Sequence, residues 1–401
     1  MNSVYIVDIL RTAVGKFGGT LSSIRPDDLA AKTIKGLIQR NNGIDWAEVD
    51  DVIFGAANQA GEDNRNVARM ASLLAGLPEN VPGYTVNRLC ASGLQSLQNA
   101  YMAIKSGEAN MIIAGGTESM TRAPFVMAKA ENAFSRTPEI YDTTIGWRFT
   151  NPALSKLHYP FSMGETAENV AEKWKISRDR QDAFALSSQE KWLAAKQRGA
   201  FKDEIISVEI TQRKKDTILF DTDEHPRLSS LETLSGLKPA FRENGTVTAG
   251  NSSGINDGAA CALVVSEDIL KRYNLIPMAR IVGFGVAGVD PAYMGIGPIP
   301  ATQKALNKAG LNIKDMDVME LNEAFAAQVL ASMDELKADP NKINLNGGSI
   351  AIGHPLGASG TRISATLLHQ FKQNKSLKYG LATMCIGVGQ GSAVIFENLN
   401  R

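Results

Sequence analysis

The stretch Gly43-Ile-Asp-Trp-Ala-Glu-Val-Asp-Asp51 returns in altered form as Gly310-Leu-Asn-Ile-Lys-Asp-Met-Asp317. Each version has the pattern of a helix end that leads into an apolar strand. The motifs Cys90-Ala-Ser-Gly93 and Gly357-Ala-Ser-Gly360 each open a segment of helical period. The offset from Asp51 to Asp317 differs by a single position from the offset between Gly93 and Gly360. Because order and offset agree, we interpret the chain as two copies of one α/β unit.

Apolar segments rich in Val and Ile alternate with segments of helical period, which is typical of α/β layers with helices covering sheets. The expected strands are 4–9, 51–54, 111–114, 261–265, 318–321 and 381–385, and the expected helices are 26–39, 91–105, 166–174, 178–198, 301–308 and 361–370. Between about 121 and 248 the pattern changes, and most charge runs and three of the four tryptophans lie there. We expect an insertion of helices and loops over the site.

The composition excludes several classes of protein. The 401 residues include 42 basic and 42 acidic side chains, so the formal net charge is zero, and 44% are hydrophobic. Balanced charge argues against a general nucleic-acid binder, and the apolar content suffices to bury a core. We interpret the short basic run Arg213-Lys-Lys215 as a solvated face. Every apolar run is too short to cross a bilayer, so we expect no membrane span.

Three cysteines occur, at Cys90, Cys261 and Cys385, and none belongs to a CxxC motif. This pattern argues against a disulfide framework, a structural zinc site and an iron–sulfur cluster, so we expect no metal. The apolar segment 3–10 has no basic region before it and no small-residue cleavage site after it. We therefore expect the mature chain to start at or near Met1 and to stay in the cytoplasm.

Cys90 falls where a short strand pattern gives way to a helical one. Free N–H groups and the positive end of the helix dipole at this place favour a thiolate and can receive a developing oxyanion. Most free cysteines are small buried apolar residues, so the position alone leaves both interpretations open. Cys261 lies inside a continuous apolar run, and we assign it to the core.

Three further residues are candidates for chemistry. His354 stands between Gly353 and Pro355 in a stretch with five glycines in residues 347–360, which suits a displayed general base as well as a hydrogen-bonded loop histidine. Cys385 ends an apolar strand, where α/β sites are usually built. Asn322 directly follows the expected strand 318–321 and could either cap the next helix or orient a water or a substrate carbonyl.

One motif is rejected. Gly283-Phe-Gly-Val-Ala-Gly288 matches the GxGxxG pattern of dinucleotide-binding turns. A helix would have to open there, but the following residues 289–300 contain three prolines and two glycines. The hypothesis of an NAD-dependent dehydrogenase therefore has no supporting motif.

Six motifs together resemble the thiolase family, the acyl-CoA C-acyltransferases, and they occur in family order over nearly the whole chain. They are Asn87-Arg-Leu-Cys-Ala-Ser-Gly93, Gly115-Gly-Thr-Glu-Ser-Met120, Thr248-Ala-Gly-Asn-Ser-Ser-Gly254, Asn322-Glu-Ala-Phe-Ala-Ala327, Gly353-His-Pro-Leu-Gly-Ala-Ser-Gly360 and Cys385-Ile-Gly387. The resemblance implies an α/β fold, the duplicated thiolase fold, with a five-layer α-β-α-β-α core. It implies an N-terminal half at 1–120 and 249–275, a loop domain over the CoA site at 121–248, and a C-terminal half at 276–401.

The resemblance also implies catalytic roles. Cys90 would be acylated by the substrate, His354 would activate Cys90, and Cys385 would move the proton at the Cα of acetyl-CoA. Asn322 would hold a water that, with His354, stabilises the enolate oxygen. The backbone N–H groups of Cys90 and Gly387 would form a second oxyanion hole for the tetrahedral intermediate.

Contacts with coenzyme A follow from the same resemblance. Ser253 would contact the pantetheine arm, and Met163, Arg227, Phe241 and Phe325 would help to line the groove. Coenzyme A and acyl-CoA would be substrates, and no cofactor or metal would be bound permanently. We expect a homodimer or a homotetramer, with no nucleic-acid or membrane partner.

Two residues differ from the pattern of many thiolases and limit the range of expected substrates. Val388 stands where many thiolases have a glycine, and Ser162 stands where biosynthetic acetoacetyl-CoA thiolases have a histidine. Both residues, with the segments 57–69 and 142–149, resemble the 3-oxoadipyl-CoA thiolases of aromatic catabolism. We therefore expect 3-oxoadipyl-CoA as the substrate, with Arg148 or a nearby basic residue meeting the distal carboxylate.

Several alternatives stay open beside this expectation. Within the family, they are an acetoacetyl-CoA thiolase and a thiolase of fatty-acid β-oxidation. A condensing enzyme of the ketoacyl-synthase type would use a cysteine with two histidines, but Cys385 takes the place of the second histidine. A homologue that only binds CoA would be favoured by loss of Cys90, His354 or Cys385, and all three are present.

Overall fold

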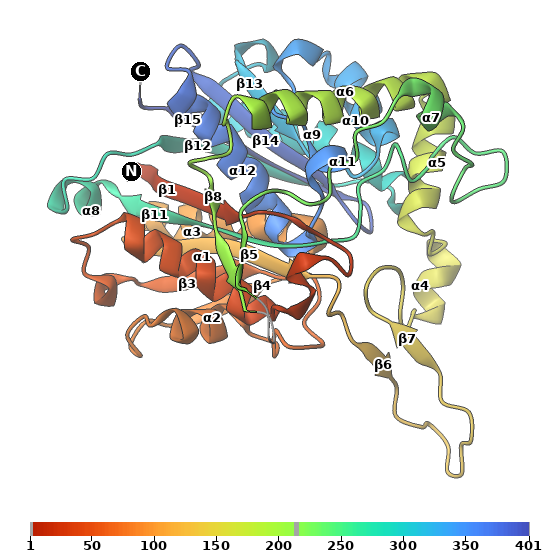
Figure 1. Ribbon diagram of the computed structural model, residues 1–401, viewed down its shortest axis with the longest axis horizontal. Coiled ribbons are helices and arrows are strands. Elements are labelled where there is room, and N and C mark those ends of the chain that lie inside the picture. Colours follow the sequence, from red (N-terminus) through yellow and green to blue (C-terminus); the bar gives the residue numbers. More distant parts are fainter. Residues whose placement is uncertain (1–2, 212–215, 401) are drawn as a thin grey trace.

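The two copies build sheets with the same order of strands. The computed structural model describes residues 3–211 and 216–400 (Figure 1), so the basic run at 213–215 and the expected start at Met1 lie outside the described residues. The N-terminal order is β1-β11-β5-β3-β4 and the C-terminal order is β12-β15-β14-β13. These strands are β1 (Val4–Thr12), β3 (Asp51–Gly55), β4 (Gly83–Val86), β5 (Met111–Ser119), β11 (Asn256–Ser266), β12 (Ala279–Gly288), β13 (Val318–Leu321), β14 (Tyr379–Ile386) and β15 (Gln390–Asn398).

Strand direction repeats as well. In the first copy, β5 pairs in parallel with β3 and antiparallel with β11; in the second, β14 pairs in parallel with β13 and antiparallel with β15. The two sheets join where β1 pairs antiparallel with β12, at Tyr5 with Arg280 and at Ile6 with Ala279. The duplication inferred from the sequence offset is therefore present in the fold. The rejected GxGxxG motif lies within the strand β12, with no helix opening at it.

The helices form three layers around these sheets. α1 (Pro26–Arg40) and α2 (Val67–Ala75) pack on one outer face, and α9 (Pro298–Ala309) and α10 (Ala326–Leu336) pack on the other. α3 (Ser92–Ser106) and α12 (Leu356–Gln373) lie between the sheets and share one core with strands of both copies. This arrangement is the five-layer α-β-α-β-α fold expected from the sequence.

Most elements outside the layers belong to the segment between the copies, while β2, α8 and α11 belong to the copies themselves. Figure 1 shows a hairpin of β6 and β7 extending away from the layers, and α6 running along the C-terminal half. The elements outside the layers are β2 (Gly15–Lys16), β6 (Phe125–Met127), β7 (Ile140–Asp142), α4 (Pro152–Leu157), α5 (Met163–Lys173), α6 (Arg178–Gln197), β8 (Ile205–Ile206), β9 (Val208–Ile210), β10 (Ile218–Phe220), α7 (Leu231–Ser235), α8 (Glu267–Arg272) and α11 (Ser349–Ile352). Among the helices of residues 3–211 and 216–400, none is long and apolar enough to cross a membrane.

The N-terminal ends of α3 and α12 touch through glycines. A Cβ atom at Gly360 would fall on the backbone nitrogen of Leu94, and one at Gly93 or Gly116 would fall on the carbonyl oxygen of Gly357. Only hydrogen fits at these positions, because backbone atoms rather than flexible side chains occupy the space. The glycines of the two related motifs thus set the distance between the copies.

We expect Gly360→Ala to destabilise the protein by about 1–3 kcal/mol, because the added methyl group collides with the backbone of α3. The matched control is Gly236→Ala, where the nearest atoms to a Cβ lie 3.6 Å away and the backbone is helical. Thermal unfolding measures both variants. A Tm for Gly360→Ala within about one degree of the control would contradict this account of the interface.

Candidate active site

Cys90 lies in a tight turn between a strand and a helix. β4 ends at Val86, and a 3-10 turn, Leu89–Ala91, leads directly into α3. Leu89 has a left-handed backbone (φ 47°), which turns the chain sharply just before the cysteine. Cys90 is half-buried and lies at the N-terminal end of α3, the position expected from the sequence pattern.

The surroundings of Cys90 keep its thiol protonated at neutral pH, so the expectation from the sequence that this position favours a thiolate is wrong. Burial raises the pKa of Cys90 above its ordinary value, and the nearby Glu118 adds to this effect. The backbone N–H groups of Gly387 and of Cys90 itself interact with Sγ and act in the opposite direction. These two N–H groups come from opposite copies of the fold and lie where an oxyanion beside Cys90 would form.

His354 is held as a neutral imidazole with a defined tautomer. Its Nδ1 lies 2.6 Å from Oγ of Ser359, whose hydroxyl donates to the carbonyl of Pro355 at 2.7 Å. Because that hydroxyl proton is used, Nδ1–H is the donor to Ser359, and Nε2 is left free to accept a proton. Burial and the charge of Arg362 lower the pKa of His354 to about 3.

Asn322 faces His354 rather than capping a helix. Its Nδ2 lies 3.4 Å from Nε2 of His354. The N-cap position of α10 is occupied by Phe325, and no side chain caps that helix end. Of the two interpretations that the sequence left open, the capping one is therefore wrong.

Cys385 is buried beside Cys90. It is 1% exposed near the carboxyl end of β14 and packs in one cluster with Met163 and Phe325. Burial raises the pKa of Cys385, and the proximity of Cys90 raises it further. Cys261 is fully buried in the outer core of the N-terminal copy, as the sequence indicates.

A cavity of about 390 Å³ opens at Cys90. This size suits a small-molecule site. Its lining comes from both copies and from the inserted segment: Ala57, Asn58, Leu89, Cys90, Glu118, Met120, Ala123, Thr143, Thr144, Ile145, Gly146, Trp147, Arg148, Ser162, Met163, Leu356, Gly387 and Val388. Among these residues, Arg148 has the one basic side chain.

The two residues that depart from the family pattern both line this cavity. Val388 has a left-handed backbone (φ 61°), which is costly for a β-branched residue, and its side chain is 39% exposed. Ser162 caps α5 by accepting a hydrogen bond from the N–H of Glu165, while the Glu165 carboxylate accepts one from Ser162 N–H. This capping box fixes Met163 at the first position of α5.

Two of the other residues expected to bind CoA lie beside α5: Phe241 packs over Gly164, and Phe325 shares a cluster with Met163. The rings of Phe241 and Phe325 pack edge to face with centroids 6.1 Å apart, and the N–H of Ser253 donates to the carbonyl of Ala324. Arg227 is exposed, and its guanidinium donates to the carbonyl of Ala249 in the loop that leads to Ser253. Of the expected CoA residues, Met163 lines the cavity at Cys90.

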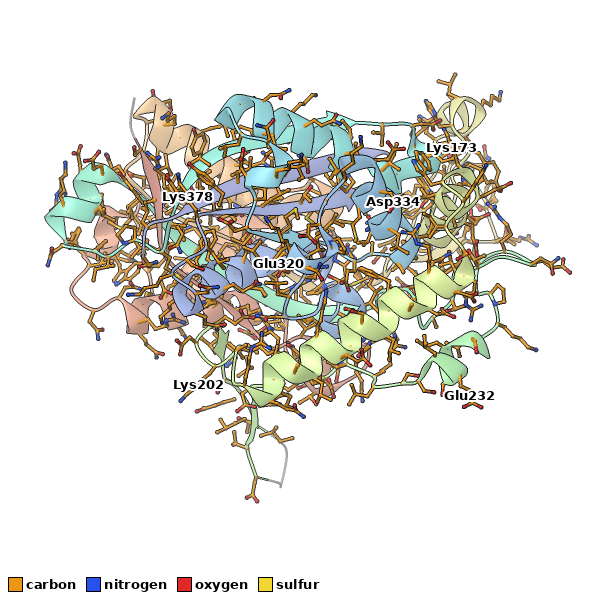
Figure 2. All side chains as sticks on the ribbon, turned by 90° about the horizontal axis from the view of Figure 1, so that it is seen from above. Lys173, Lys202, Glu232, Glu320, Asp334 and Lys378 are labelled. Atoms are coloured by element: carbon orange, nitrogen blue, oxygen red, sulfur yellow. The ribbon has the colours of Figure 1, made fainter. Side chains whose placement is uncertain are left out.

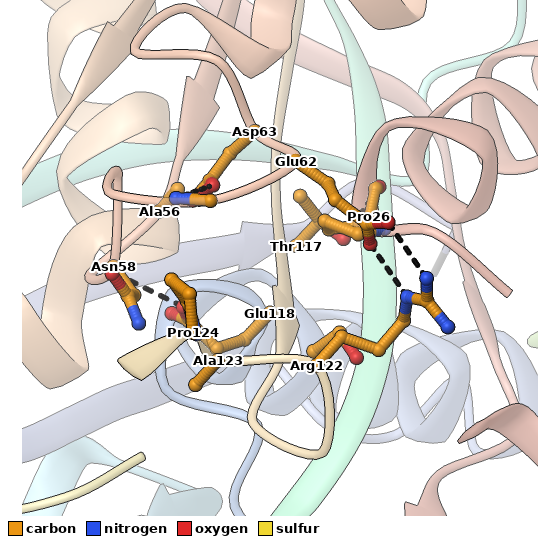
Figure 3. A pocket seen from close by; sticks show the side chains of 12 residues that line it. Pro26, Ala56, Asn58, Glu62, Asp63, Thr117, Glu118, Arg122, Ala123 and Pro124 are labelled. Carbon is orange, nitrogen blue, oxygen red and sulfur yellow. Dashed lines mark hydrogen bonds and ion pairs between the residues drawn. The ribbon is translucent and has the colours of Figure 1, made fainter. Parts of the chain in front are cut away.

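Glu118 is a site residue without a role in the sequence interpretation. Its carboxylate accepts hydrogen bonds from the N–H groups of Ala57, Asn58 and Gly357, and burial raises its pKa to about 7. Glu118 also lines a second cavity of about 10 Å³, room for one water, where Arg122 pairs with Glu62 (Figure 3). The sequence offered one indication of a role for Glu118, since this carboxylate belongs to the motif 115–120, one of the six that resemble the thiolase family.

Ser349, Ser359 and Arg362 are further residues that the sequence interpretation missed. All three are fully buried and hydrogen-bonded to His354, to Asn322 or to each other. The available signal was a set of polar residues in the glycine-rich stretch and in an otherwise apolar helix.

Comparisons with known proteins agree over the whole chain. The family models for the thiolase N-terminal and C-terminal domains match residues 4–268 and 275–398. The beta-ketoadipyl-CoA thiolase of Acinetobacter baylyi is 53% identical, and the match covers 100% of both chains. The 3-oxoadipyl-CoA/3-oxo-5,6-dehydrosuberyl-CoA thiolase of Escherichia coli K12 is 54% identical over the same shares.

Two solved structures have the same fold. The acetyl-CoA acetyltransferase of Bacillus anthracis superimposes with a TM-score of 0.93 at 42% identity and covers 100% of this chain and 99% of its own. Human mitochondrial 3-ketoacyl-CoA thiolase in complex with CoA gives a TM-score of 0.91 at 43% identity, with coverage of 99% and 98%.

We expect iodoacetamide to modify Cys90 first, because Cys261 and Cys385 are buried. The rate should rise about tenfold per pH unit from pH 6 to about pH 8, since burial raises the pKa of Cys90 above its ordinary value and a neutral His354 provides no ion pair. Peptide mass spectrometry identifies the site, with Cys90→Ser as the control. A rate that levels off below pH 8 would show a preformed thiolate and contradict the neutral pair.

Proposed function

The chain belongs to the thiolase family of acyltransferases, and from this premise we propose that it cleaves 3-oxoadipyl-CoA with CoA to acetyl-CoA and succinyl-CoA. The observation that carries the proposal is the arrangement at Cys90. Cys90 and Gly387, with their two backbone N–H groups, line one cavity at the junction of the copies. The buried thiol of Cys385 lies beside Cys90, and the neutral imidazole of His354 faces Asn322 just before α12. Cleavage of a carbon–carbon bond beside a thioester needs a nucleophile, an oxyanion site, a base and a proton donor.

The first half of the reaction acylates Cys90. Sγ of Cys90 attacks the C3 carbonyl, and Nε2 of His354, the nitrogen left unprotonated, takes the thiol proton. The C2–C3 bond breaks and the electron pair moves to acetyl-CoA as an enolate, whose oxygen faces His354 and a water held by Asn322. The thiol of Cys385 donates its proton to the enolate carbon, and acetyl-CoA leaves.

The second half transfers the acyl group to CoA. The thiolate of Cys385 takes the proton of the incoming CoA thiol, which attacks the acyl-Cys90 thioester. The N–H groups of Cys90 and Gly387 stabilise the tetrahedral oxyanion. When it collapses, the Cys90 sulfur leaves and recovers the proton held by His354, so every group returns to its starting state.

The proposal of a dicarboxylic substrate rests on the cavity and on the relatives. Two relatives that match the full chain at 53% and 54% identity carry the names beta-ketoadipyl-CoA thiolase and 3-oxoadipyl-CoA/3-oxo-5,6-dehydrosuberyl-CoA thiolase. The cavity at Cys90 is mostly apolar, and Arg148 is its one basic side chain; the one acidic side chain, Glu118, already accepts hydrogen bonds from three backbone N–H groups. We assign Arg148 to the distal carboxylate of the substrate.

The remaining assignments complete the proposal. Ser253, Met163, Arg227, Phe241 and Phe325 bind the CoA arm, and the packing of Phe241 and Phe325 beside Met163 and Gly164 of α5 supports part of this set. The N-terminal half consists of residues 1–120 and 249–275, the loop domain of 121–248 and the C-terminal half of 276–401. The strand β11 pairs between β1 and β5, which supports the assignment of 249–275 to the N-terminal half. The protein acts as a homodimer or homotetramer in the cytoplasm, where three free cysteines are chemically stable.

We expect the enzyme to cleave 3-oxoadipyl-CoA with a higher kcat/KM than 3-oxohexanoyl-CoA, which has the same chain length without the distal carboxylate, and than acetoacetyl-CoA. Arg148→Met should lower kcat/KM for 3-oxoadipyl-CoA about 10- to 100-fold, since a charged hydrogen bond is lost. The value for 3-oxohexanoyl-CoA should stay within about twofold. If the wild type prefers acetoacetyl-CoA, the proposed substrate is wrong. If the variant keeps the preference for 3-oxoadipyl-CoA, only the role assigned to Arg148 is wrong.

We expect Cys385→Ala to abolish thiolysis while acetyl-CoA still acylates Cys90, although more slowly, because the enolate carbon has no other proton donor, whereas CoA can leave as a thiolate and take its proton from water. Thiolysis should fall more than about 100-fold, and mass spectrometry should show acetyl-Cys90 in the variant. Cys261→Ala is the matched control, since Cys261 is a buried thiol outside the site. Full thiolysis by Cys385→Ala would exclude Cys385 from the reaction.

A further inference from the structure

A chain of buried hydrogen bonds leads from Arg362 to the base. Nη2 of Arg362 lies 2.5 Å from Oγ of Ser349, and that Oγ lies 2.5 Å from Oδ1 of Asn322. Nδ2 of Asn322 then faces Nε2 of His354 at 3.4 Å. The side chains come from α12, α11, the end of β13 and the loop before α12, so the chain links four separate segments.

The direction of these bonds follows from the donors. The guanidinium of Arg362 can only donate, so Oγ of Ser349 accepts from it. The single hydroxyl proton of Ser349 is then free to donate to Asn322, whose Oδ1 can only accept. The amide of Asn322 is thereby held with its oxygen toward Ser349 and its NH₂ group toward His354.

Ser349 has no other evident use in the fold. It is fully buried at the start of α11, a helix of one turn, and its hydroxyl joins two side chains. Without it, the carbonyl oxygen of Asn322 would lose this donor, and the side chain could rotate or flip. The NH₂ group would then no longer face the place where Nε2 of His354 lies.

Arg362 holds its place without a close ion pair. It is 1% exposed, and among the described residues its Nε and Nη1 atoms have no hydrogen-bond partner. The acidic side chain acting most strongly on it is Glu320, near the centre of the molecule in Figure 2, and burial raises the pKa of Glu320 to about 8. The bond to Ser349 therefore aims the guanidinium, while its charge disfavours protonation of His354.

We propose that Ser349 and Arg362 are positioning residues for the thiolase reaction, acting through Asn322 on the step that forms the enolate. The inference rests on the proposed function, because it assigns Asn322 to the enolate oxygen. The oxyanion site at the N–H groups of Cys90 and Gly387 lies outside this chain of bonds. The two halves of the reaction should therefore respond differently when Ser349 is changed.

The test compares Ser349→Ala with Ser364→Ala. Ser364 is also fully buried near the site, but its hydroxyl donates to the Gly360 carbonyl within α12. Two rates are measured for each variant: thiolysis of 3-oxoadipyl-CoA, which needs the enolate, and exchange of labelled CoA into acetyl-CoA, which needs only acyl-Cys90. For Ser349→Ala, kcat of thiolysis should fall about 10- to 100-fold, while exchange and KM for CoA stay within about threefold; both rates stay near wild type in Ser364→Ala.

A double variant gives a second measurement, the coupling between Ser349 and Asn322, which a merely structural role of Ser349 would not produce. Adding Ser349→Ala to Asn322→Ala should lower thiolysis no further, because the two residues act as one unit. Equal losses of thiolysis and exchange, no loss of either, or additive losses in the double variant would each overturn the inference. The wild-type enzyme separates this inference from the proposed function. If it exchanges CoA but does not cleave 3-oxoadipyl-CoA, the proposed substrate is overturned, and acetoacetyl-CoA replaces it as the probe of thiolysis. If it does not exchange CoA, the proposed function itself is overturned.

Discussion

The close approach of α3 and α12 is the constraint on which the site depends. Each helix begins with one version of the same motif, and the glycines of these motifs place backbone against backbone. This contact places the turn of Cys90 against α12, which directly follows the loop of His354, although the two segments lie in opposite copies of the repeat and far apart in the sequence. A larger residue at Gly93, Gly116 or Gly360 would push the copies apart and separate the groups that must react together.

Burial is the second constraint, and it keeps the reacting groups neutral. A neutral thiol at Cys90 and a neutral imidazole at His354 carry no mutual attraction before the substrate arrives. Charge develops only as a bond to the substrate forms, when the N–H groups of Cys90 and Gly387 are already in place to receive it. Fixed donors at a largely buried site stabilise that charge without first having to reorganise.

Much of the fold could be predicted from the sequence because the signals are local or repeated. Each expected strand and helix occurs within a few residues of its expected position, and the offset between repeated motifs revealed the duplication. Contacts across the copies could not be predicted, since they depend on which residues the packing brings face to face. Glu118 and Gly357 are 239 residues apart, and neither pattern nor propensity connects them. The same holds for the bonds of Ser349, and for the left-handed backbone of Val388.

The glycine contact also decides how many reaction centres one chain can hold. The repeat offset pairs Cys90 of the first copy with Gly357 of the second. A side chain at Gly357 would collide with the backbone of Gly55, Ala56 and Thr117. A second nucleophile at the equivalent position therefore has no room, and the duplication leaves a single acyl-accepting sulfur per polypeptide. Saturation of the enzyme with an acyl donor should accordingly stop at one equivalent, whatever the number of subunits in the assembly.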